Sequence, residues 1–318
     1  MARIARRGVG IAIAGAALVL VGMVGALGPL SPGRTAHAAS PCAGWTMRTL
    51  FSGLGTLEYL HPDRSGGMLI SNQSDGAIER ITRGGVRTTV LPNVNGPGAM
   101  TIRGGELYFT TGDSAQSGVN GTADGTIDQA DLTTYHRTTY SSGLIMPNGL
   151  TFSEVGDAYV TRDIGTDAQV VKVPASSPSQ PVQHWANLGD TNGARVDPTQ
   201  TWLYVSTTFN QPADVYRIRL TNPADIEVVA SLANTGNALP KGLDDMTEDG
   251  NGILYIAANG SGEVLRLDPT TGQSCQLAAG LQNPSAVEFG TGHGWPRDHL
   301  FVCGFDGTIR ELSPPARS

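Results

Sequence analysis

Four residues that carry side-chain oxygen atoms stand at corresponding places in a pattern that recurs along the chain. Asn148, Asn192 and Asp244 each lie five positions before another polar residue of their own copy, and Glu58 holds the corresponding place in the first copy. Two carboxylates and two amide carbonyls are hard oxygen ligands, and calcium accepts about six to eight such ligands. This set leaves positions for water or substrate, which allows a metal ion to act as a Lewis acid. The residue types therefore predict a divalent cation site, with calcium as the expected ion, because matched cysteine and histidine ligands for zinc or copper are absent.

The pattern that carries these residues returns six times. Each copy has a turn-rich lead, an alternating apolar strand, a turn marked by glycine and another alternating strand. The clearest apolar strands are Ala158–Val160, Leu203–Val205 and Leu254–Ile256, and looser copies are Met68–Ile70, Leu107–Phe109 and Leu300–Val302. A spacing of roughly 40 to 50 residues is typical of four-stranded propeller blades. We therefore expect an all-β fold, a six-bladed β-propeller with four-stranded blades.

The last blade needs a strand from elsewhere in the chain. After Leu312 only six residues remain, so this blade has no fourth strand of its own. An unpaired edge would expose a row of backbone donors and acceptors. We predict that Trp45–Phe51, which precedes the first blade, completes the last one and closes the ring.

The first 38 residues have the features of a signal peptide. Arg3, Arg6 and Arg7 precede the apolar run Val9–Leu27, and Ala36–Ala38 supplies the small residues that signal peptidase accepts. We expect cleavage near Ala38 and a secreted or extracytoplasmic protein whose propeller domain is residues 39–318. The apolar run is also long enough to span a bilayer, so an uncleaved anchor is the alternative and the only expected link to a membrane.

The composition narrows the classes of partner. Loss of the four arginines in residues 1–38 would take the formal net charge from −7 to −11. No basic stripe interleaved with aromatic residues is present, so nucleic acid is not an expected partner. The mature chain keeps Cys42, Cys275 and Cys303. Export permits one disulfide among them, and the sequence leaves the pairing open.

Each candidate ligand has a simpler interpretation when it is taken alone. Asn148 and Asn192 precede glycines, and Asn-Gly is foremost a hairpin-turn signal. Asp244 and Asp245 fit a solvated loop, and Glu58 fits a surface acid. The same position carries oxygen in four units that differ almost everywhere else, which favours the cation site over these alternatives.

Taken together, these residues resemble the calcium-dependent six-bladed propellers of the senescence marker protein (regucalcin), gluconolactonase and diisopropyl fluorophosphatase family. The resemblance rests on Glu58, Pro147–Leu150, Asn192–Ala194 and Leu243–Met246. It implies that the metal ligands are Glu58, Asn148, Asn192 and Asp244. It also implies that calcium polarises an ester carbonyl while a carboxylate activates water. Thr247 replaces the acid that serves a second calcium in the fluorophosphatase branch, which argues against a second metal here.

The sequence thus predicts an exported, calcium-dependent hydrolase of lactones or related esters, acting as a monomer on a small molecule. Asp244 is the expected catalytic carboxylate as well as a ligand, and Asp245 beside it can take the same catalytic role. Ser285 heads the inner strand of the last blade, and His61 follows Glu58; we expect both to line the substrate pocket. The alternative is a propeller that only binds a ligand or partner, as in NHL-repeat and strictosidine synthase relatives.

Overall fold

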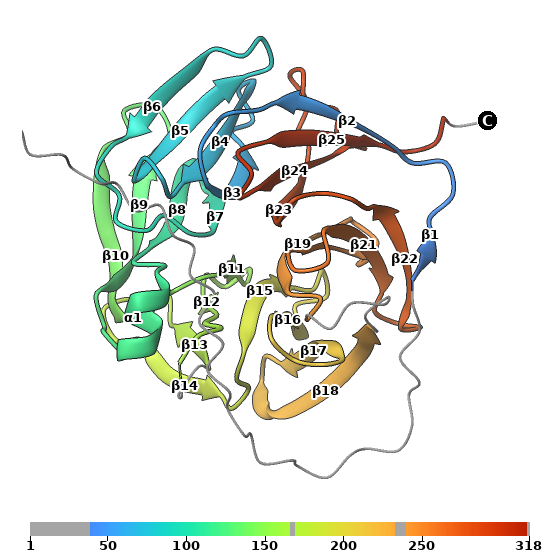
Figure 1. The fold of residues 1–318 in the computed structure, drawn as a ribbon. Helices are drawn as coiled ribbons and strands as arrows, with labels where there is room; N and C mark the ends of the chain where they lie inside the picture. Colours follow the sequence, from blue (N-terminus) through green and yellow to red (C-terminus); the bar gives the residue numbers. More distant parts are fainter. Residues whose placement is uncertain (1–38, 166–168, 233–239, 317–318) are drawn as a thin grey trace, which may run out of the picture. The chain divides into compact units, whose positions relative to one another are not determined.

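A computed structural model describes residues 39–165, 169–232 and 240–316. The predicted signal peptide, residues 1–38, lies outside the described residues. Thr35–Ser318 forms one compact unit, and Figure 1 shows its sheets arranged around a centre. No helix within the described ranges is long and apolar enough to cross a membrane.

The expected fold is confirmed: six sheets form the blades of a propeller, each with four antiparallel strands, and one of the sheets has a short fifth strand added at its edge. The first three blades, each from its inner strand outward, are β3 (Leu57–Pro62), β4 (Gly67–Asn72), β5 (Ala77–Thr82) and β6 (Arg87–Leu91); β7 (Met100–Arg103), β8 (Glu106–Thr111), β9 (Gly125–Asp131) and β10 (Arg137–Leu144); and β11 (Leu150–Phe152), β12 (Ala158–Val160), β13 (Val170–Val173) and β14 (Val182–Ala186).

The remaining blades follow the same order. They are β15 (Thr191–Val196), β16 (Trp202–Thr207), β17 (Ala213–Arg219) and β18 (Asn222–Leu232); β19 (Leu243–Glu248), β20 (Leu254–Ala258), β21 (Glu263–Asp268) and β22 (Gln273–Ala278); and β23 (Pro284–Phe289), β24 (Leu300–Gly304), β25 (Ile309–Ser313) and β2 (Thr46–Phe51). Each inner strand contacts the inner strands of the neighbouring blades, and β23 contacts β3, so the ring is closed.

The N-terminal strand closes the ring as predicted. β2 pairs antiparallel with β25, from Thr46 opposite Ser313 to Phe51 opposite Ile309. The structure adds a contact that the sequence did not predict: β1 (Ser40–Pro41) lies parallel to β22 at the edge of the fifth blade. A disulfide between Cys42 and Cys275 joins the two strands there, and Cys303 is a buried free thiol. The N-terminal segment is therefore attached to two blades rather than one.

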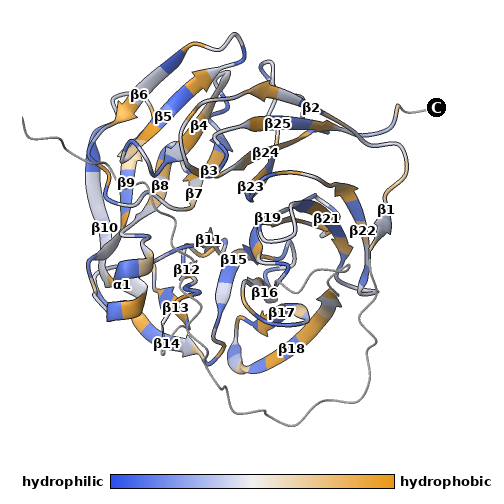
Figure 2. Ribbon diagram, in the orientation of Figure 1, coloured by the Kyte–Doolittle hydropathy of each residue, from blue (hydrophilic) through white to orange (hydrophobic). Residues whose placement is uncertain are grey.

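The apolar core lies between the blades. Figure 2 shows hydrophobic residues along the strands of every blade, with hydrophilic residues among them. One buried cluster contains Met68 of β4, Phe109 of β8 and Phe301 of β24, and so joins the first, second and last blades. Because blades bury both faces of each sheet in this way, middle strands such as β4 are buried along their whole length.

One short helix interrupts the strands. α1 (Ala115–Asn120) follows β8, with Ser114 as its N-cap and Gly121 as its C-cap. A Cβ atom at Gly118 would lie only 2.6 Å from Met146 Sδ and 3.0 Å from Ile164 Cβ. The helix backbone therefore packs closely against residues that flank the third blade.

Candidate functional site

The predicted ligands lie at the beginning of the inner strands, where the strand pairing is irregular. The pairing of each inner strand with the second strand of its blade shifts register at Glu58, at Asn192 and Gly193, and at Asp244 and Asp245. Such bulges re-aim side chains and are common beside active sites. Asn148 stands two residues before β11. The irregularity sets Glu58, Asn192 and Asp244 apart from the regular ladder, and Asn148 lies outside the paired part of its strand.

Hydroxyl groups from the preceding blade hold several of these strand ends in place. Thr110 Oγ1 donates to the Asn148 carbonyl at 3.2 Å, and Thr161 Oγ1 donates to the Asn192 carbonyl. Ser206 Oγ donates to the Asp244 carbonyl at 2.9 Å and accepts from the Gly193 N–H at 2.8 Å. These hydroxyl residues occupy equivalent places at the ends of their blades' second strands. They fix the backbone from which the candidate ligands project.

The two Asn-Gly pairs are sites of close backbone approach, not hairpin turns. Neither Gly149 nor Gly193 has a positive φ, and Gly193 lies inside β15. A Cβ atom at Gly149 would lie 2.5 Å from the Asn192 carbonyl oxygen, and one at Gly193 would lie 2.6 Å from the Asp244 carbonyl oxygen. Glycine is required here because the inner strands of adjacent blades touch.

The carboxyl groups at this end of the strands raise one another's pKa. Burial raises the pKa of Glu58 well above its usual value, and the charges of four aspartates raise it further. These aspartates are Asp113, Asp244, Asp245 and Asp163. Burial likewise raises the pKa of Asp244, and Asp245, Asp163 and Asp113 add to that effect. We call Glu58, Asn148, Asn192 and Asp244, with Asp113 and Asp163 beside them, the acidic ring.

Sequence reasoning missed Asp113 and Asp163, although a signal for one of them exists. Asp163 stands two positions after the hydroxyl residue Thr161, and Thr208 and Asn259 hold the same place in the next two blades. Thr208 Oγ1 donates to Asp163 Oδ2 at 3.2 Å, and Asn259 Nδ2 donates to Asp244 Oδ2 at 3.1 Å. Alignment on the second strands would therefore have found this outer set of polar residues.

Two amide oxygens of the acidic ring have unmet hydrogen-bonding capacity. Asn148 and Asn192 are only 6% and 4% exposed, and their Oδ1 atoms have no hydrogen-bond partner among the described residues. Asn192 Nδ2 donates to Thr208 Oγ1 at 3.0 Å, which fixes the orientation of that amide. A buried polar atom without a partner costs free energy. A cation bound beside these oxygens would satisfy them and offset the surrounding negative charge, and side-chain oxygens are the ligands that calcium prefers.

The described part of the chain contains no metal site built from acidic, histidine and cysteine side chains alone. No group of three histidine, cysteine, aspartate or glutamate side chains there has the geometry to hold a metal ion. A cation at the acidic ring would therefore depend on the two asparagine amides as well as on Glu58 and Asp244. Calcium binding stays a prediction.

A second polar cluster lies three residues farther along the same strands. Arg195 forms an ion pair with Glu288 Oε1, and Tyr59 Oη donates to the same oxygen at 2.7 Å. Thr247 Oγ1 donates to Glu288 Oε2 at 2.9 Å, and His61 Nδ1 lies 3.8 Å from Oε1. We call these five residues the arginine cluster. Their positions correspond to the acidic ring, since Arg195 follows Asn192, and Thr247 follows Asp244, by three residues.

The arginine cluster has its own positive charge. Burial alone would raise the pKa of Glu288, but Arg195, with smaller contributions from His61 and Tyr59, holds it at about 2. Asp245 interacts with both groups, since its charge raises the pKa of Glu58 and of Asp244, and the charge of Arg195 lowers its own pKa. Burial raises its pKa to about 7 against the lowering effect of Arg195. Its Oδ2 atom is buried and has no hydrogen-bond partner within the residues described.

The two residues expected to line the substrate pocket have other contacts. Ser285 is fully buried, and its hydroxyl donates to the Leu57 carbonyl at 2.8 Å, so it holds the backbone beside Glu58. His61 lies beside Glu288 in the arginine cluster rather than with the acidic ring. Glu58 lies close enough to Asp244 and Asp245 that the negative charges of the two aspartates raise its pKa. That Ser285 and His61 line a substrate pocket stays a prediction.

Comparison with known proteins identifies the fold. No family model matches the chain, and no curated protein matches it. A solved gluconolactonase from Xanthomonas campestris is 17% identical, with a TM-score of 0.67 over 89% of this chain and 99% of that one. A luciferin-regenerating enzyme is 11% identical, with a TM-score of 0.63 over 86% and 96%. Virginiamycin B lyase from Staphylococcus aureus is 15% identical, with a TM-score of 0.56 over 85% and 98%. At these identities the likeness shows a shared propeller fold.

Proposed function

We propose that this chain is an exported, calcium-dependent hydrolase of lactones or related esters. The observation that carries the proposal is the pair of buried, unpartnered amide oxygens of Asn148 and Asn192 beside carboxyl groups with raised pKa values. The similarity in fold to a gluconolactonase supports the lactone as the substrate class. Residues 1–38 support export through their signal-peptide pattern.

Glu58, Asn148, Asn192 and Asp244 would hold the calcium ion. When bound, calcium supplies Lewis-acid polarisation of the ester carbonyl. The protein's part is to keep the ligand oxygens in position before the ion arrives. The hydroxyl groups of Thr110 and Ser206 do this for the backbone, and Asn259 does it for the Asp244 carboxylate.

Attack of water on the carbonyl carbon requires a group that accepts a proton. Asp244 Oδ1 accepts the backbone N–H of Asp245 at 3.1 Å, and Oδ2 accepts from Asn259, so this carboxylate is held in one orientation. Asp245 Oδ2 has no such donor in the described structure. We assign the proton-accepting role to these two adjacent carboxylates. A general base in this position contributes about 10²- to 10⁴-fold to the rate.

The charge of the acidic ring also suits the direction of the reaction. A lactone is neutral and becomes a hydroxy-acid anion when its ring opens. Asp113 and Asp163 add negative charge beside the ligands. Like charges repel more strongly in a buried site than in water. Negative charge that the calcium ion does not offset would therefore disfavour the anionic product more than the neutral substrate.

Hydrolysis of a panel of lactones and esters, measured with calcium and with a chelator, tests this function. We expect turnover that disappears with the chelator and returns when calcium is added. Activity that is unchanged in metal-free protein, or no activity on any substrate of the panel, would overturn the proposal. Calorimetry that shows tight calcium binding without hydrolysis would instead support the alternative of a binding scaffold. N-terminal sequencing of the protein from its native cells tests export, with a first residue after Ala38 as the expected result.

A further inference from the structure

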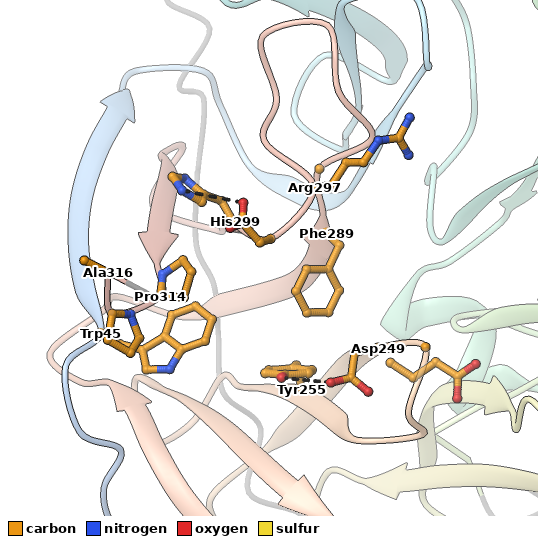
Figure 3. Close-up of a pocket in the computed structure, with 13 residues that line it drawn as sticks. Trp45, Asp249, Tyr255, Phe289, Arg297, His299, Pro314 and Ala316 are labelled. Carbon is orange, nitrogen blue, oxygen red and sulfur yellow. Dashed lines mark hydrogen bonds and ion pairs between the residues drawn. The ribbon is translucent and has the colours of Figure 1, made fainter. Parts of the chain in front are cut away.

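A pocket lies at the far end of two inner strands from the acidic ring. It has a volume of about 670 Å³ and opens where β19 ends at Glu248 and β23 ends at Phe289. Trp45, Tyr255 and Pro314 complete its main walls (Figure 3). We call this cavity the seam pocket, because it lies where the N-terminal strand closes the ring. Its lining shares no residue with the acidic ring or the arginine cluster.

Three aromatic rings form the apolar part of the seam pocket. The Tyr255 ring centroid lies 5.0 Å from that of Phe289, with the rings nearly perpendicular at 85°, and 6.5 Å from that of Trp45. Figure 3 shows the rings on different sides of one space. Tyr255 is buried, and its hydroxyl donates to Asp249 Oδ2 at 3.3 Å, which fixes that ring. The faces of aromatic rings carry negative electrostatic potential and attract cations.

The charged residues of the seam pocket are mainly acidic. Glu248, Asp249 and Asp298 line it, against one arginine and one histidine. His299 Nδ1 lies 2.8 Å from Glu311 Oε1, and the Arg297 side chain points away from the three rings in Figure 3. Glu248 Oε2 is buried and has no hydrogen-bond partner in the part of the chain that the structure describes. The pocket thus combines aromatic walls with more acidic than basic side chains.

We propose that the seam pocket binds an organic ammonium ion. The aromatic rings of Trp45, Tyr255 and Phe289 contact its alkyl groups, and Glu248 opposes its charge. A compact cation with apolar substituents matches both halves of the lining, whereas a neutral ligand leaves the acidic half without a ligand of opposite charge. This inference does not depend on hydrolysis or calcium, since the pocket lies outside the acidic ring.

Titration of the purified protein with choline tests the proposal, with the Trp45 indole followed by NMR. The matched ligand is the uncharged carbon analogue of choline, in which carbon replaces the ammonium nitrogen. We expect saturable shifts of the Trp45 signal with choline and affinity for the carbon analogue lower by about tenfold or more. Equal affinity for the two ligands would show a pocket that selects only apolar shape, and the absence of saturable binding would show no site. Either result overturns the proposal.

Two substitutions separate the charge from the rings. Glu248→Gln should weaken choline binding by about tenfold, because it removes the opposing charge. Phe289→Leu should weaken choline and its carbon analogue unequally, with the larger loss for choline. Glu154→Gln makes the same change at an exposed acid of the third blade and should leave choline binding unchanged. Thermal unfolding confirms that each variant is folded, and choline binding that survives Glu248→Gln at full strength in folded protein would contradict the assigned role of Glu248.

Discussion

The acidic ring and the arginine cluster occupy equivalent places on the same inner strands, three residues apart. The pKa values of their carboxyl groups are nevertheless shifted in opposite directions from those of ordinary acids. Burial and neighbouring aspartates raise the pKa of Glu58 and Asp244. Arg195 holds the pKa of Glu288 at about 2 in spite of its burial. The repeat thus supplies two layers of polar residues of similar composition, the acidic ring and the arginine cluster. Only the arginine cluster contains its own cation, the side chain of Arg195. We therefore expect the layer without a cation to be the one that binds a ligand ion, and the neutralised layer to act as a structural support.

The largest expected effect comes from the acidic ring itself. Asp244→Ala removes a ligand and a proton acceptor together, so we expect lactone turnover to fall by about 10³-fold or more. Asn148→Ala and Asn192→Ala should weaken calcium binding first and reduce turnover when calcium is limiting. Initial rates across a range of calcium concentrations separate these effects. Wild-type turnover in Asp244→Ala would remove the acidic ring from the mechanism.

The arginine cluster should respond in stability rather than in calcium binding. Arg195→Leu leaves Glu288 buried without its ion-pair partner, a change that typically costs about 3–5 kcal/mol. The double variant Arg195→Leu with Glu288→Leu removes both charges and should recover much of that loss. Urea unfolding measures the free energies. A single variant as stable as the wild type would show that the ion pair is not what supports this layer.

The two layers should also respond oppositely to pH. In metal-free protein the acidic ring and the adjacent Asp245 hold protons that the unfolded chain releases near pH 4, since Asp163 has a pKa of about 6 and Asp245 one of about 7. Their contribution to stability is present at low pH and is lost as the pH rises through those values. Glu288 contributes stability above its usual pKa of 4.5, which is lost only as the pH falls toward 2.

Calcium should cancel the loss of stability at higher pH. At about 100 times its Kd, a ligand that binds only the folded state adds about 2.7 kcal/mol. Protons compete with calcium for the same carboxylates, so we expect the increase in Tm on adding calcium to be larger near pH 8 than near pH 5. Calorimetric unfolding with calcium and with a chelator at both pH values checks this. An equal gain at both values would place the bound ion away from the raised carboxyl groups.

The fold was predictable because its information is local and repeated. Strand alternation and glycine-marked turns recur in every blade, and the short tail after Leu312 required a strand such as Trp45–Phe51 to complete the ring. The pairing of Cys42 with Cys275 was not predictable, because the two cysteines are 233 residues apart and meet only through the ring. Three cysteines in the sequence allow any of the possible pairs.

The candidate site was predictable in part for a similar reason. Glu58, Asn192 and Asp244 share a register along the inner strands, so one alignment found them. The pairing of Arg195 with Glu288 joins different blades and leaves no local pattern. His61, which we expected to line the substrate pocket, follows Glu58 by three residues along β3 and lies beside Glu288 of the arginine cluster.

The smallest expected effect compares one hydroxyl group from each layer. Ser206→Ala leaves the Asp244 carbonyl and the Gly193 N–H without their partner, and Thr247→Val removes one donor to Glu288 Oε2. Each change should cost about 1–3 kcal/mol of stability, since buried polar groups lose a hydrogen bond. Only Ser206→Ala should also weaken calcium binding, because that hydroxyl holds the strand end from which Asp244 projects. Urea unfolding and calcium calorimetry on both variants measure the difference. A similar loss of calcium affinity in Thr247→Val would show that the two layers act as one unit, and the distinction between a binding layer and a supporting layer would then be wrong.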